Sequence, residues 1–537
     1  MSSPDNRIKS QGNGRSAIFD LFEVQVERTP DAIALVQEDH HVTYDQLNRY
    51  ANQLAWYLRK NRVGEESRIA LCLPRSIHAV IGLLGILKTG ASYVPLDPES
   101  PGHRRSFILE ETQVEWLITQ ESELHRLQEC SCHIMCLDRD PQDRANQPSE
   151  NLSIKIPPGS PAYIMYTSGS TGRPKGVLGH HDGVRNYFEY LHEVYDLNGT
   201  DVVLQVAPLT FDASLRDCIG PLTFGAKVLL LDQKQRQDPV VMLGRIREQQ
   251  VTCLLSLSPS RLNALVEAGT EQEGPFDSLR LILVSGEAFY RSLAQRTQKL
   301  FGHQVVLVNQ YGPSECTMTS TYFQIAHEMP EKEIISIGSP IARSQILILD
   351  SALQATPALI AGEIYLSGPG LTWGYLGHPD MTADQFRPNA LSRDPGSRMY
   401  KTGDLAKYGS DGSLYFLGRA DRQVKINGVR IELGEIEAVL MGCQSIAKCA
   451  VVAREPKKNL VAYERTSAGA ESGTPQLRLL AYFVSNGKIS YSNIRQFLKA
   501  YLPSYMMPHE LIQMDHLPLN QNEKVDLQAL ADPKSVR

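Results

Sequence analysis

Short apolar runs alternate with helix-like patterns through most of the chain, and this alternation limits the folds available to it. The apolar runs cover residues 69–73, 162–166, 202–206, 228–231, 253–255, 281–284 and 305–308. Between several of them, apolar residues recur at helical spacing, as in residues 77–88 and 240–249. Strands that are apolar on both faces and are separated by helices form mostly parallel sheets covered by helices. The sequence therefore predicts an α/β fold of layered, mostly parallel sheets with helices.

The length of 537 residues exceeds what one hydrophobic core normally serves, so we expect more than one domain. The pattern changes after residue 417, where a polar segment bounded by glycines is typical of a linker and a first hairpin. The residues beyond it suffice for a small α+β domain. Its expected elements are helices at 436–441 and 494–501, strands at 450–453 and 480–484, and an exposed, mobile loop at 455–477. We expect a flexible N-terminus (1–16), a large domain (17–420) and a small domain (421–537).

Composition and charge exclude several functional classes. A formal net charge of -6 gives no general attraction for nucleic acid or anionic lipid. The N-terminal residues are polar and lack the apolar core of a secretion signal, and the longest apolar stretch, residues 79–87, is too short to span a bilayer. Nine scattered cysteines are typical of a reducing environment rather than of a disulfide framework. We expect a cytoplasmic protein that binds neither nucleic acid nor membranes.

Four potential metal ligands lie close together in the sequence: Cys130, Cys132, His133 and Cys136. Structural zinc sites normally combine paired ligands from two separate segments. These four sit in one short, polar stretch. We therefore favour thiols on a strand and its neighbouring loop over a metal site.

The most informative segment is YIMYTSGSTGRPKGV, residues 163–177. An apolar strand runs into a loop of glycines, hydroxyls and one lysine, namely Thr167, Ser168, Gly169, Ser170, Thr171, Gly172, Lys175 and Gly176. Glycines let backbone N–H groups converge on phosphate oxygens, hydroxyls donate further hydrogen bonds, and the lysine supplies charge. The loop differs from the G-x4-G-K-[ST] type, because Pro174 precedes the lysine and no Ser or Thr follows it. We predict a phosphate-binding loop rather than a flexible connector.

This loop resembles the signature of the adenylate-forming enzymes, and in particular the amino-acid adenylation domains of nonribosomal peptide synthetases. Other motifs of that family follow in order from about residue 18 to residue 526. They are TYDQLN (43–48), LKTGASYVPLD (87–97), NQYGPSE (309–315), GEIYLSG (362–368), YKTGD (400–404), GRADRQVKINGVRIELGEIE (418–437) and LPLNQNEKVD (517–526). The ordered set is far more specific than any one motif. The resemblance implies a luciferase-like large domain with a small mobile domain, ATP and Mg²⁺, and an amino acid as substrate.

In such enzymes the substrate carboxylate attacks the α-phosphorus of ATP and pyrophosphate leaves, so catalysis needs positioned cations and donors. By resemblance, the hydroxyls and glycines at 167–172 and Lys175 bind the phosphates, and Glu315 holds Mg²⁺. Asp404 would accept hydrogen bonds from both ribose hydroxyls, assisted by Arg419. The resemblance also implies a nucleotide pocket in which Tyr311 stacks on adenine, formed by Gly286, Asn309, Gln310, Tyr311 and Gly312.

Two residues are assigned to the moving part of such an enzyme. Lys524 resembles the C-terminal lysine that bridges the reacting carboxylate and the α-phosphate, and with Thr167, Lys175 and Glu315 it completes the expected catalytic set. In this chain Glu523 stands where the family usually has glycine, which puts the geometry of that loop in question. Asp421 matches the hinge about which the small domain would rotate between an adenylating and a thioester-forming arrangement.

The segment FDASLRD, residues 211–217, carries the specificity argument. In members that activate α-amino acids, an aspartate after this phenylalanine pairs with the substrate ammonium, and Asp212 fits. The plain alternative is an aspartate that caps a helix. By the same resemblance the rest of the amino-acid pocket consists of Phe211, Ala213, Arg216, Ser256, Leu283, Ser285, Gln310, Met318 and Thr319.

Two interpretations of this pocket compete. Arg216 forms a bidentate pair with an acidic side chain such as aspartate or methyl-aspartate, or it narrows the cavity, with Gln310 and Met318, around a compact residue such as proline. The chain ends eleven residues past Asp526, and no carrier or condensation segment is evident. We therefore expect a stand-alone ligase that loads a separate phosphopantetheinylated carrier protein in natural-product biosynthesis, with L-proline as the leading substrate.

Two other functional classes remain open at this stage. An acyl-CoA synthetase would use free coenzyme A as acceptor, although Asp212 and the amino-acid-type motifs at Thr43 and Tyr93 argue against it. A degenerate nucleotide-binding module would have lost catalytic residues, yet Lys175, Glu315, Asp404 and Lys524 are all present.

Overall fold

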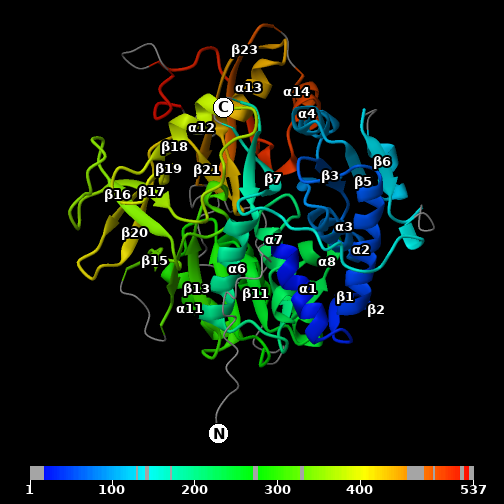
Figure 1. Ribbon diagram of the computed structural model, residues 1–537. Helices are drawn as coiled ribbons and strands as arrows, with labels where there is room; N and C mark the ends of the chain where they lie inside the picture. Colours follow the sequence, from blue (N-terminus) through cyan, green and yellow to red (C-terminus); the bar gives the residue numbers. More distant parts are fainter. Residues whose placement is uncertain are drawn as a thin grey trace.

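Two largely parallel sheets and the helices that pack on them form the larger part of the chain (Figure 1). The structure is a computed structural model that describes residues 17–127, 131–139, 144–169, 172–269, 276–326, 332–455, 477–487, 490–519 and 525–530. The predicted α/β class, with a large N-terminal domain and a small C-terminal one, is confirmed. The expected flexible N-terminus and most of the loop expected at 455–477 lie outside the described residues.

The larger of these sheets has nine described strands. The strands from β13 to β1 pair in parallel, as their apolar sequences predict, and the strands at the two edges pair antiparallel. In order across the sheet they are β15 (Ser339–Pro340), β14 (Thr321–Gln324), β13 (Val306–Tyr311), β12 (Leu281–Ser285), β11 (Cys253–Leu257), β9 (Val202–Leu204), β10 (Lys227–Leu230), β1 (Ile33–Gln37) and β2 (His40–Thr43).

The second sheet has six described strands and ends in an antiparallel pair. Its order is β6 (His133–Cys136), β5 (Trp116–Thr119), β3 (Arg68–Cys72), β4 (Ser92–Leu96), β7 (Pro161–Thr167) and β8 (Lys175–His180). Residues Thr167 and Lys175 face each other across β7 and β8. The predicted phosphate loop is therefore the turn of a hairpin at the edge of this sheet.

Helices fill the space between the two sheets and cover their outer faces. Helices α1, α2, α3 and α6 share one hydrophobic core with both sheets, whereas α9, α10 and α11 pack on the far side of the nine-stranded sheet. Helix α2 begins at a capping box, in which Gln46 N–H donates to Thr43 Oγ1 over 3.2 Å. The helices of the large domain are α1 (Ile18–Arg28), α2 (Tyr44–Lys60), α3 (Ile77–Lys88), α4 (Gly102–Thr112), α6 (His181–Tyr195), α7 (Ala213–Cys218), α8 (Gln233–Gln237), α9 (Pro239–Glu248), α10 (Pro259–Ala268), α11 (Arg291–Phe301) and α12 (Pro379–Gln385).

A third, antiparallel sheet lies beside these layers, and the apolar-run pattern did not anticipate it. Its strands are β16 (Gln345–Leu349), β17 (Gly362–Ser367), β19 (Arg398–Tyr408) and β18 (Phe386–Pro388), with β20 (Leu414–Arg419) paired to β19. Buried and partly exposed residues alternate along β19, as expected of a strand with one solvated face. The pairing of β19 with β20 sets Asp404 opposite Arg419.

The small domain has the predicted α+β composition and its own core. Helices α13 (Leu433–Met441) and α14 (Tyr491–Tyr501) pack on a sheet of β23 (Ile446–Arg454), β24 (Arg478–Ser485) and β25 (Glu510–Gln513). Strands β21 (Val424–Ile426) and β22 (Val429–Ile431) form the expected hairpin. In Figure 1 this domain lies at the top, with α14 beside α4.

Several contacts hold the small domain against the large one. Arg104 Nη1 lies 2.8 Å from Glu435 Oε1, and both side chains are buried. The His103 ring stacks on Tyr501 with a centroid distance of 4.6 Å. Gly428 at the tip of the β21–β22 hairpin donates its N–H to Glu287 Oε1 over 2.6 Å. We call this arrangement the docked arrangement.

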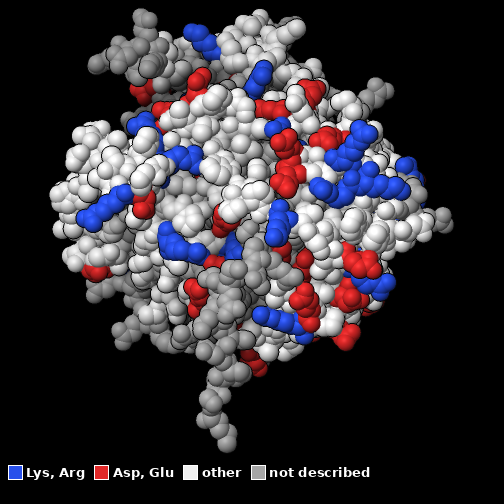
Figure 2. All heavy atoms as spheres, viewed as in Figure 1, with Lys and Arg blue, Asp and Glu red and all other residues white. Residues whose placement is uncertain are grey.

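Other sequence expectations concern the surface and the cysteines. Acidic and basic side chains are interspersed on the face seen in Figure 2. None of the described helices has the length and apolar character that crossing a membrane requires. Cys136 lies on β6, whereas Cys130 is outside the described residues. Within the described part of the chain, the cysteines form no disulfide and no three His, Cys, Asp or Glu residues gather as a metal site would need.

His181 provides a test of how the N-terminal helix is held. It is 1% exposed, and its Nδ1 accepts a hydrogen bond from Ile18 N–H over 3.2 Å at the start of α1. Burial, together with the charge of His180, lowers the pKa of His181 to about 3. In the unfolded chain the His181 imidazole binds a proton near pH 6.5, whereas in the folded chain it stays neutral until the pH approaches 3. Stability is therefore expected to fall as the pH drops from 6.5 towards 3.

The measurement is thermal unfolding of the wild type and His181→Gln at pH 7.5 and pH 5. The wild type is expected to lose about 2 kcal/mol more stability than the variant over this range, because glutamine does not titrate. Equal losses in the two proteins would contradict the assignment.

Candidate active site

The phosphate loop connects β7 to β8, and its described glycines are required by packing. A Cβ at Gly169 would lie 1.9 Å from Arg173 O. Gly172 has a φ of +83°, and a Cβ there would lie 2.6 Å from Ala438 Cβ in the small domain. Thr167 Oγ1 is buried without a hydrogen-bond partner among the described residues, which suits a group that meets a ligand. Ser170 and Thr171 lie outside the described residues.

Lys175 and Glu315, two residues of the expected catalytic set, lie close together beside this loop. Lys175 Nζ donates to Tyr375 Oη over 3.0 Å and lies 3.3 Å from Glu315 Oε1. Burial and the nearby charge of Arg430 lower the pKa of Lys175 to about 8. Burial alone would raise the pKa of Glu315, but the charges of Arg430 and Lys175 outweigh it and hold that pKa below its usual range.

A cavity of about 400 Å³ lies at the carboxyl ends of β12 and β13, between the nine-stranded sheet, the third sheet and the β21 hairpin. We call it the first cavity. Its lining includes the predicted nucleotide residues Gly286, Asn309, Gln310, Tyr311, Gly312, Asp404 and Arg419. Asn309 Nδ2 donates to Ser336 O over 2.9 Å, which leaves Oδ1 available as an acceptor for an adenine amino group. Carboxyl ends of parallel strands are the usual place for a nucleotide.

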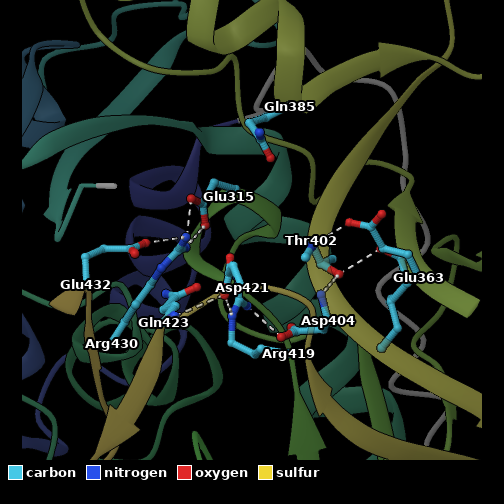
Figure 3. A network of polar contacts seen from close by, with 12 residues as sticks. Glu315, Glu363, Gln385, Thr402, Asp404, Arg419, Asp421, Gln423, Arg430 and Glu432 are labelled. Carbon is cyan, nitrogen blue, oxygen red and sulfur yellow. Dashed lines mark hydrogen bonds and ion pairs between the residues drawn. The ribbon is translucent and has the colours of Figure 1, made fainter. Parts of the chain in front are cut away.

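Asp404 lies at one end of a row of charged side chains that continues through Arg419 to Asp421. Tyr311 Oη donates to Asp404 Oδ2 and Arg419 Nη1 donates to Asp404 Oδ1, each over 2.6 Å. Arg419 also makes a bidentate pair with Asp421, with both distances 2.6 Å. Burial, opposed by the Arg419 hydrogen bonds and charge, leaves the pKa of Asp421 below its usual value. The predicted ribose acceptor is thus linked to the predicted hinge residue through Arg419 (Figure 3).

A second cavity of about 150 Å³ joins the predicted subsites. It is lined by groups from the phosphate loop (Thr167, Ser168), the nucleotide site (Asp404, Arg419) and the amino-acid site (Phe211, Asp212, Ala213, Arg216, Ser285, Met318). One continuous space therefore touches all three predicted subsites.

Asp212 occupies the position expected of an ammonium-binding carboxylate and also caps a short helix. Its Oδ1 accepts the N–H of Ala213 at 2.8 Å and its Oδ2 accepts the N–H of Met318 at 3.0 Å. Burial raises the pKa of Asp212, although these two backbone bonds oppose the rise. Thr317 and Met318 have φ of 53° and 68°, a strained pair that aims the Met318 amide at Asp212. The capping interpretation of Asp212 is therefore confirmed, and its binding of a substrate ammonium stays a prediction.

Arg216 is only 2% exposed and is held by uncharged partners. Its Nε donates to Ser256 Oγ over 2.9 Å, and its Nη1 donates to Gln310 Oε1 over 2.9 Å and to Tyr187 Oη over 3.2 Å. None of the described carboxylates lies within 4.0 Å of its nitrogens. Arg216 thus lies across the second cavity, and two of its three guanidinium nitrogens already donate hydrogen bonds to neighbouring side chains.

Several predicted pocket residues lie behind Arg216 rather than on the cavity surface. Ser256 bridges Arg216 and Asp217, and Thr319 Oγ1 donates to Gln310 Oε1 over 3.2 Å. Leu283 is fully buried in the core between the sheets. Asn309 and Gln310 both line the first cavity, although their side chains face opposite sides of the sheet. Gln310 was expected in both pockets, and its side chain accepts hydrogen bonds from Arg216 and Thr319, two residues of the expected amino-acid pocket.

Magnesium is implied by the resemblance, and Glu315 fits it in part. It is a fully buried carboxylate beside the phosphate loop, and Mg²⁺ commonly takes one or two carboxylates and completes its shell with phosphate oxygens and water. In the docked arrangement, however, Arg430 Nη1 lies 2.9 Å and 3.1 Å from its two oxygens. The expected catalytic Lys524, and Glu523 before it, lie outside the described residues.

The sequence interpretation missed several residues of this site. Arg430 and Gln423 belong to the 418–437 motif, but no spacing rule showed that Arg430 reaches Glu315 and the second cavity or that Gln423 lines both cavities. Gln423 is 4% exposed, and neither of its amide atoms has a partner among the described residues. Tyr187 and Tyr375 are distant in sequence from the groups they contact, so only the fold could reveal them.

Comparisons with known proteins agree with this geometry. A family model described as AMP-binding enzyme matches residues 22–376, and one described as AMP-binding enzyme C-terminal domain matches residues 435–524. Zwittermicin A synthase ZmaJ of Bacillus cereus is 35% identical over 96% of this chain and 95% of its own length. A dimodular nonribosomal peptide synthase of Bacillus subtilis is 38% identical over 96% of this chain, which spans only 21% of that relative. An artificially fused adenylation and carrier di-domain, NpsA-ThdA from Klebsiella oxytoca, shares the fold with a TM-score of 0.80, 24% identity, and coverage of 92% and 93% of the two chains.

The carboxylate at Asp404 is expected to be the main polar anchor for AMP. Asp404→Asn keeps the shape but removes the charge that two donors now share. A hydrogen bond to a charged group contributes about 1.5–3 kcal/mol, so AMP affinity measured by calorimetry is expected to fall roughly 10- to 100-fold.

Asp411→Asn, in an exposed turn of the same sheet, is the matched control and should bind AMP as the wild type does. Unchanged AMP affinity in the Asp404→Asn variant would show that Asp404 does not bind the nucleotide.

Proposed function

The chain belongs to the AMP-binding enzyme family, as an amino-acid adenylation enzyme of the nonribosomal peptide synthetase type, and from that premise we propose its particular reaction. It converts an α-amino acid, with L-proline as the leading candidate, and ATP into aminoacyl-AMP and pyrophosphate. It then transfers the aminoacyl group to the phosphopantetheine thiol of a separate carrier protein. The observation that carries this proposal is the second cavity, where the Asp212 carboxylate, the phosphate loop and Asp404 share one space.

The first half-reaction needs the substrate carboxylate near the α-phosphorus. Asp212 would anchor the substrate ammonium, and Asp404 with Arg419 would anchor the ribose, so that the two reacting groups meet between them. Thr167, Ser168 and Lys175 would bind the phosphates, and Lys524 would bridge the carboxylate and the α-phosphate. Glu315 would hold Mg²⁺, which supplies charge stabilisation for the leaving pyrophosphate.

The second half-reaction brings the carrier thiol to the carbonyl carbon and expels AMP. We place the boundary between the large and small domains at residues 420 and 421, with Asp421 as the hinge. Support comes from the bidentate Arg419–Asp421 pair, since it joins the last strand of the third sheet to the linker. Rotation there would exchange Lys524 for the β21–β22 hairpin at the site.

Electrostatic balance favours a substrate with a neutral side chain. Arg216, Asp212 and Asp217 are all buried, and together they carry one net negative charge. A bound α-ammonium group neutralises that charge. An acidic side chain would leave an uncompensated buried charge, which is costly. It would also have to displace Ser256 or Gln310 from Arg216 to form a bidentate pair. A compact, neutral residue such as proline avoids both costs.

The amino acid is identified by exchange of labelled pyrophosphate into ATP across the twenty common amino acids. L-Proline is expected to give the highest rate. The highest rate with aspartate would instead select the acidic alternative, and release of aminoacyl-CoA with free coenzyme A would select the acyl-CoA synthetase class. No exchange with any amino acid would contradict the proposed function.

Lys524→Ala is expected to abolish adenylation while leaving ATP binding largely intact, because the lysine acts on the reacting carboxylate rather than on the base or ribose. Exchange and ATP affinity are measured on the same preparations. Unimpaired pyrophosphate exchange in this variant would show that Lys524 is not the catalytic lysine.

Arg216→Leu removes the side chain that crosses the second cavity and is expected to relax specificity towards larger apolar amino acids. A residue of this kind discriminates by about 1–3 kcal/mol, so kcat/KM ratios between substrates should change roughly 10- to 200-fold. Arg245→Leu, on the surface of α9, serves as the control. A variant with an unaltered substrate profile would exclude Arg216 as a determinant.

A further inference from the structure

Behind the amino-acid subsite, a closed ring of three hydrogen bonds holds the Arg216 guanidinium. Arg216 Nη1 donates to Gln310 Oε1 over 2.9 Å and to Tyr187 Oη over 3.2 Å. Tyr187 Oη in turn donates to Gln310 Oε1 over 3.3 Å. Nη1 carries two N–H groups, so both are used within this ring. Arg216 lines the second cavity, whereas Tyr187, on helix α6, is not among the residues that line it.

The side-chain amide of Gln310 has one defined orientation in this ring. Its Oε1 also accepts from Thr319 Oγ1 over 3.2 Å, and its Nε2 donates to Tyr190 Oη over 3.5 Å. If the amide were reversed, its N–H groups would face the Arg216 guanidinium, and donors would oppose donors. The orientation of the amide therefore depends on the hydroxyls around it as well as on the arginine.

Helix α6 supplies the tyrosine hydroxyls behind Gln310. Tyr187 and Tyr190 lie one helical turn apart on this helix, and each is 1% exposed. Tyr190 Oη lies 2.6 Å from Tyr195 Oη, and the Tyr190 ring packs against Tyr322 with a centroid distance of 5.2 Å. Burial raises the pKa of Tyr190 and of Tyr195, so both hydroxyls stay neutral. The hydroxyls thus form a buried network, in which hydrogen bonds are stronger than in water.

The bonds that hold Arg216 are the ones that an acidic substrate would need. Bonds to Tyr187, Gln310 and Ser256 take three of its five N–H groups. A bidentate pair with a carboxylate uses Nη2 together with either Nη1 or Nε. Both Nη1 and Nε are already engaged, so an acidic side chain can form this pair only if the guanidinium turns away from the ring.

We propose that Tyr187 is a specificity-determining positioning residue, whose hydroxyl acts with Gln310 to hold Arg216 in the direction that selects against acidic amino acids. Without this hydroxyl, Nη1 regains a free N–H group and Gln310 loses a donor, so the guanidinium can turn towards a substrate carboxylate. The inference rests on the proposed function and deepens it. It names the class of amino acid that the pocket rejects and the buried group that enforces the rejection.

Pyrophosphate exchange with aspartate, and with the neutral amino acid that the wild type prefers, tests the proposal. Tyr187→Phe is expected to raise the ratio of kcat/KM for aspartate to that for the neutral amino acid about tenfold, the effect of one hydrogen bond to a charged group. Tyr190→Phe removes the acceptor at Gln310 Nε2 and is expected to raise the ratio by a smaller factor.

Two further variants separate positioning from a general loss of structure. In the Arg216→Leu background, Tyr187→Phe should change the ratio less than about twofold, because no guanidinium remains to turn. Tyr44→Phe is the matched control, because it removes another fully buried tyrosine hydroxyl, which donates to Ala226 O over 2.8 Å and lines neither cavity. It should keep the wild-type ratio. Thermal unfolding of each variant reports the loss of stability separately.

Several results would overturn the proposal. One is an active Tyr187→Phe enzyme with the wild-type ratio, and another is the same rise in the Arg216→Leu background or in Tyr44→Phe. If Tyr187→Phe fails to fold, an unchanged ratio in Tyr190→Phe has the same meaning. A wild type that prefers aspartate would also overturn it, since its guanidinium would then already accept a carboxylate. Absence of exchange with every amino acid would contradict the proposed function itself, and this inference with it.

Discussion

A fully buried carboxylate, Glu315, is the constraint on which the arrangement of the site depends. Burying its charge is tolerable only with cations and donors around it. These come from three parts of the molecule: Lys175 from the edge of the six-stranded sheet, Tyr375 from the segment after the third sheet's β17, and Arg430 from the small domain. One side chain thereby joins units that are far apart in the sequence. The Arg430–Glu315 pair is thus one of the contacts that place the two domains relative to each other.

A second row of charged side chains organises the nucleotide side of the site. Asp404 and Arg419 face each other on neighbouring strands, and Arg419 continues to Asp421 in the linker. The same arginine thus contacts the group proposed to bind ribose and the residue proposed as the hinge. Because the pair is short and partly buried, the linker is held close to the nucleotide site in the docked arrangement.

The amino-acid subsite is organised by the same need for balance. Asp212, Arg216 and Asp217 are buried within one short helix and the residue that precedes it, and each is held by hydrogen bonds to uncharged groups. Ser256 lies between Arg216 and Asp217, which lets the opposite charges share one hydroxyl. This network holds the guanidinium in place, as the proposed role of Arg216 as a wall of the amino-acid pocket requires. A fixed wall discriminates between side chains better than a mobile one, because a substrate that does not fit cannot push it aside without breaking hydrogen bonds.

The sequence by itself determined the elements and the chemistry of individual segments. Apolar runs and helical spacing predicted β3, β7, β12 and α3 to within a few residues, because strand burial and helix periodicity are local effects. The glycines, hydroxyls and lysine between β7 and β8 predicted a phosphate loop for the same reason. The third sheet was missed, since half-buried antiparallel strands leave only a weak alternating pattern. Only the tertiary structure decided that Tyr187 and Gln310 hold Arg216, and that Arg430 meets Glu315. Those contacts join residues that are far apart in the sequence, and pairing over such distances is set by how the layers and domains pack, which no local pattern records.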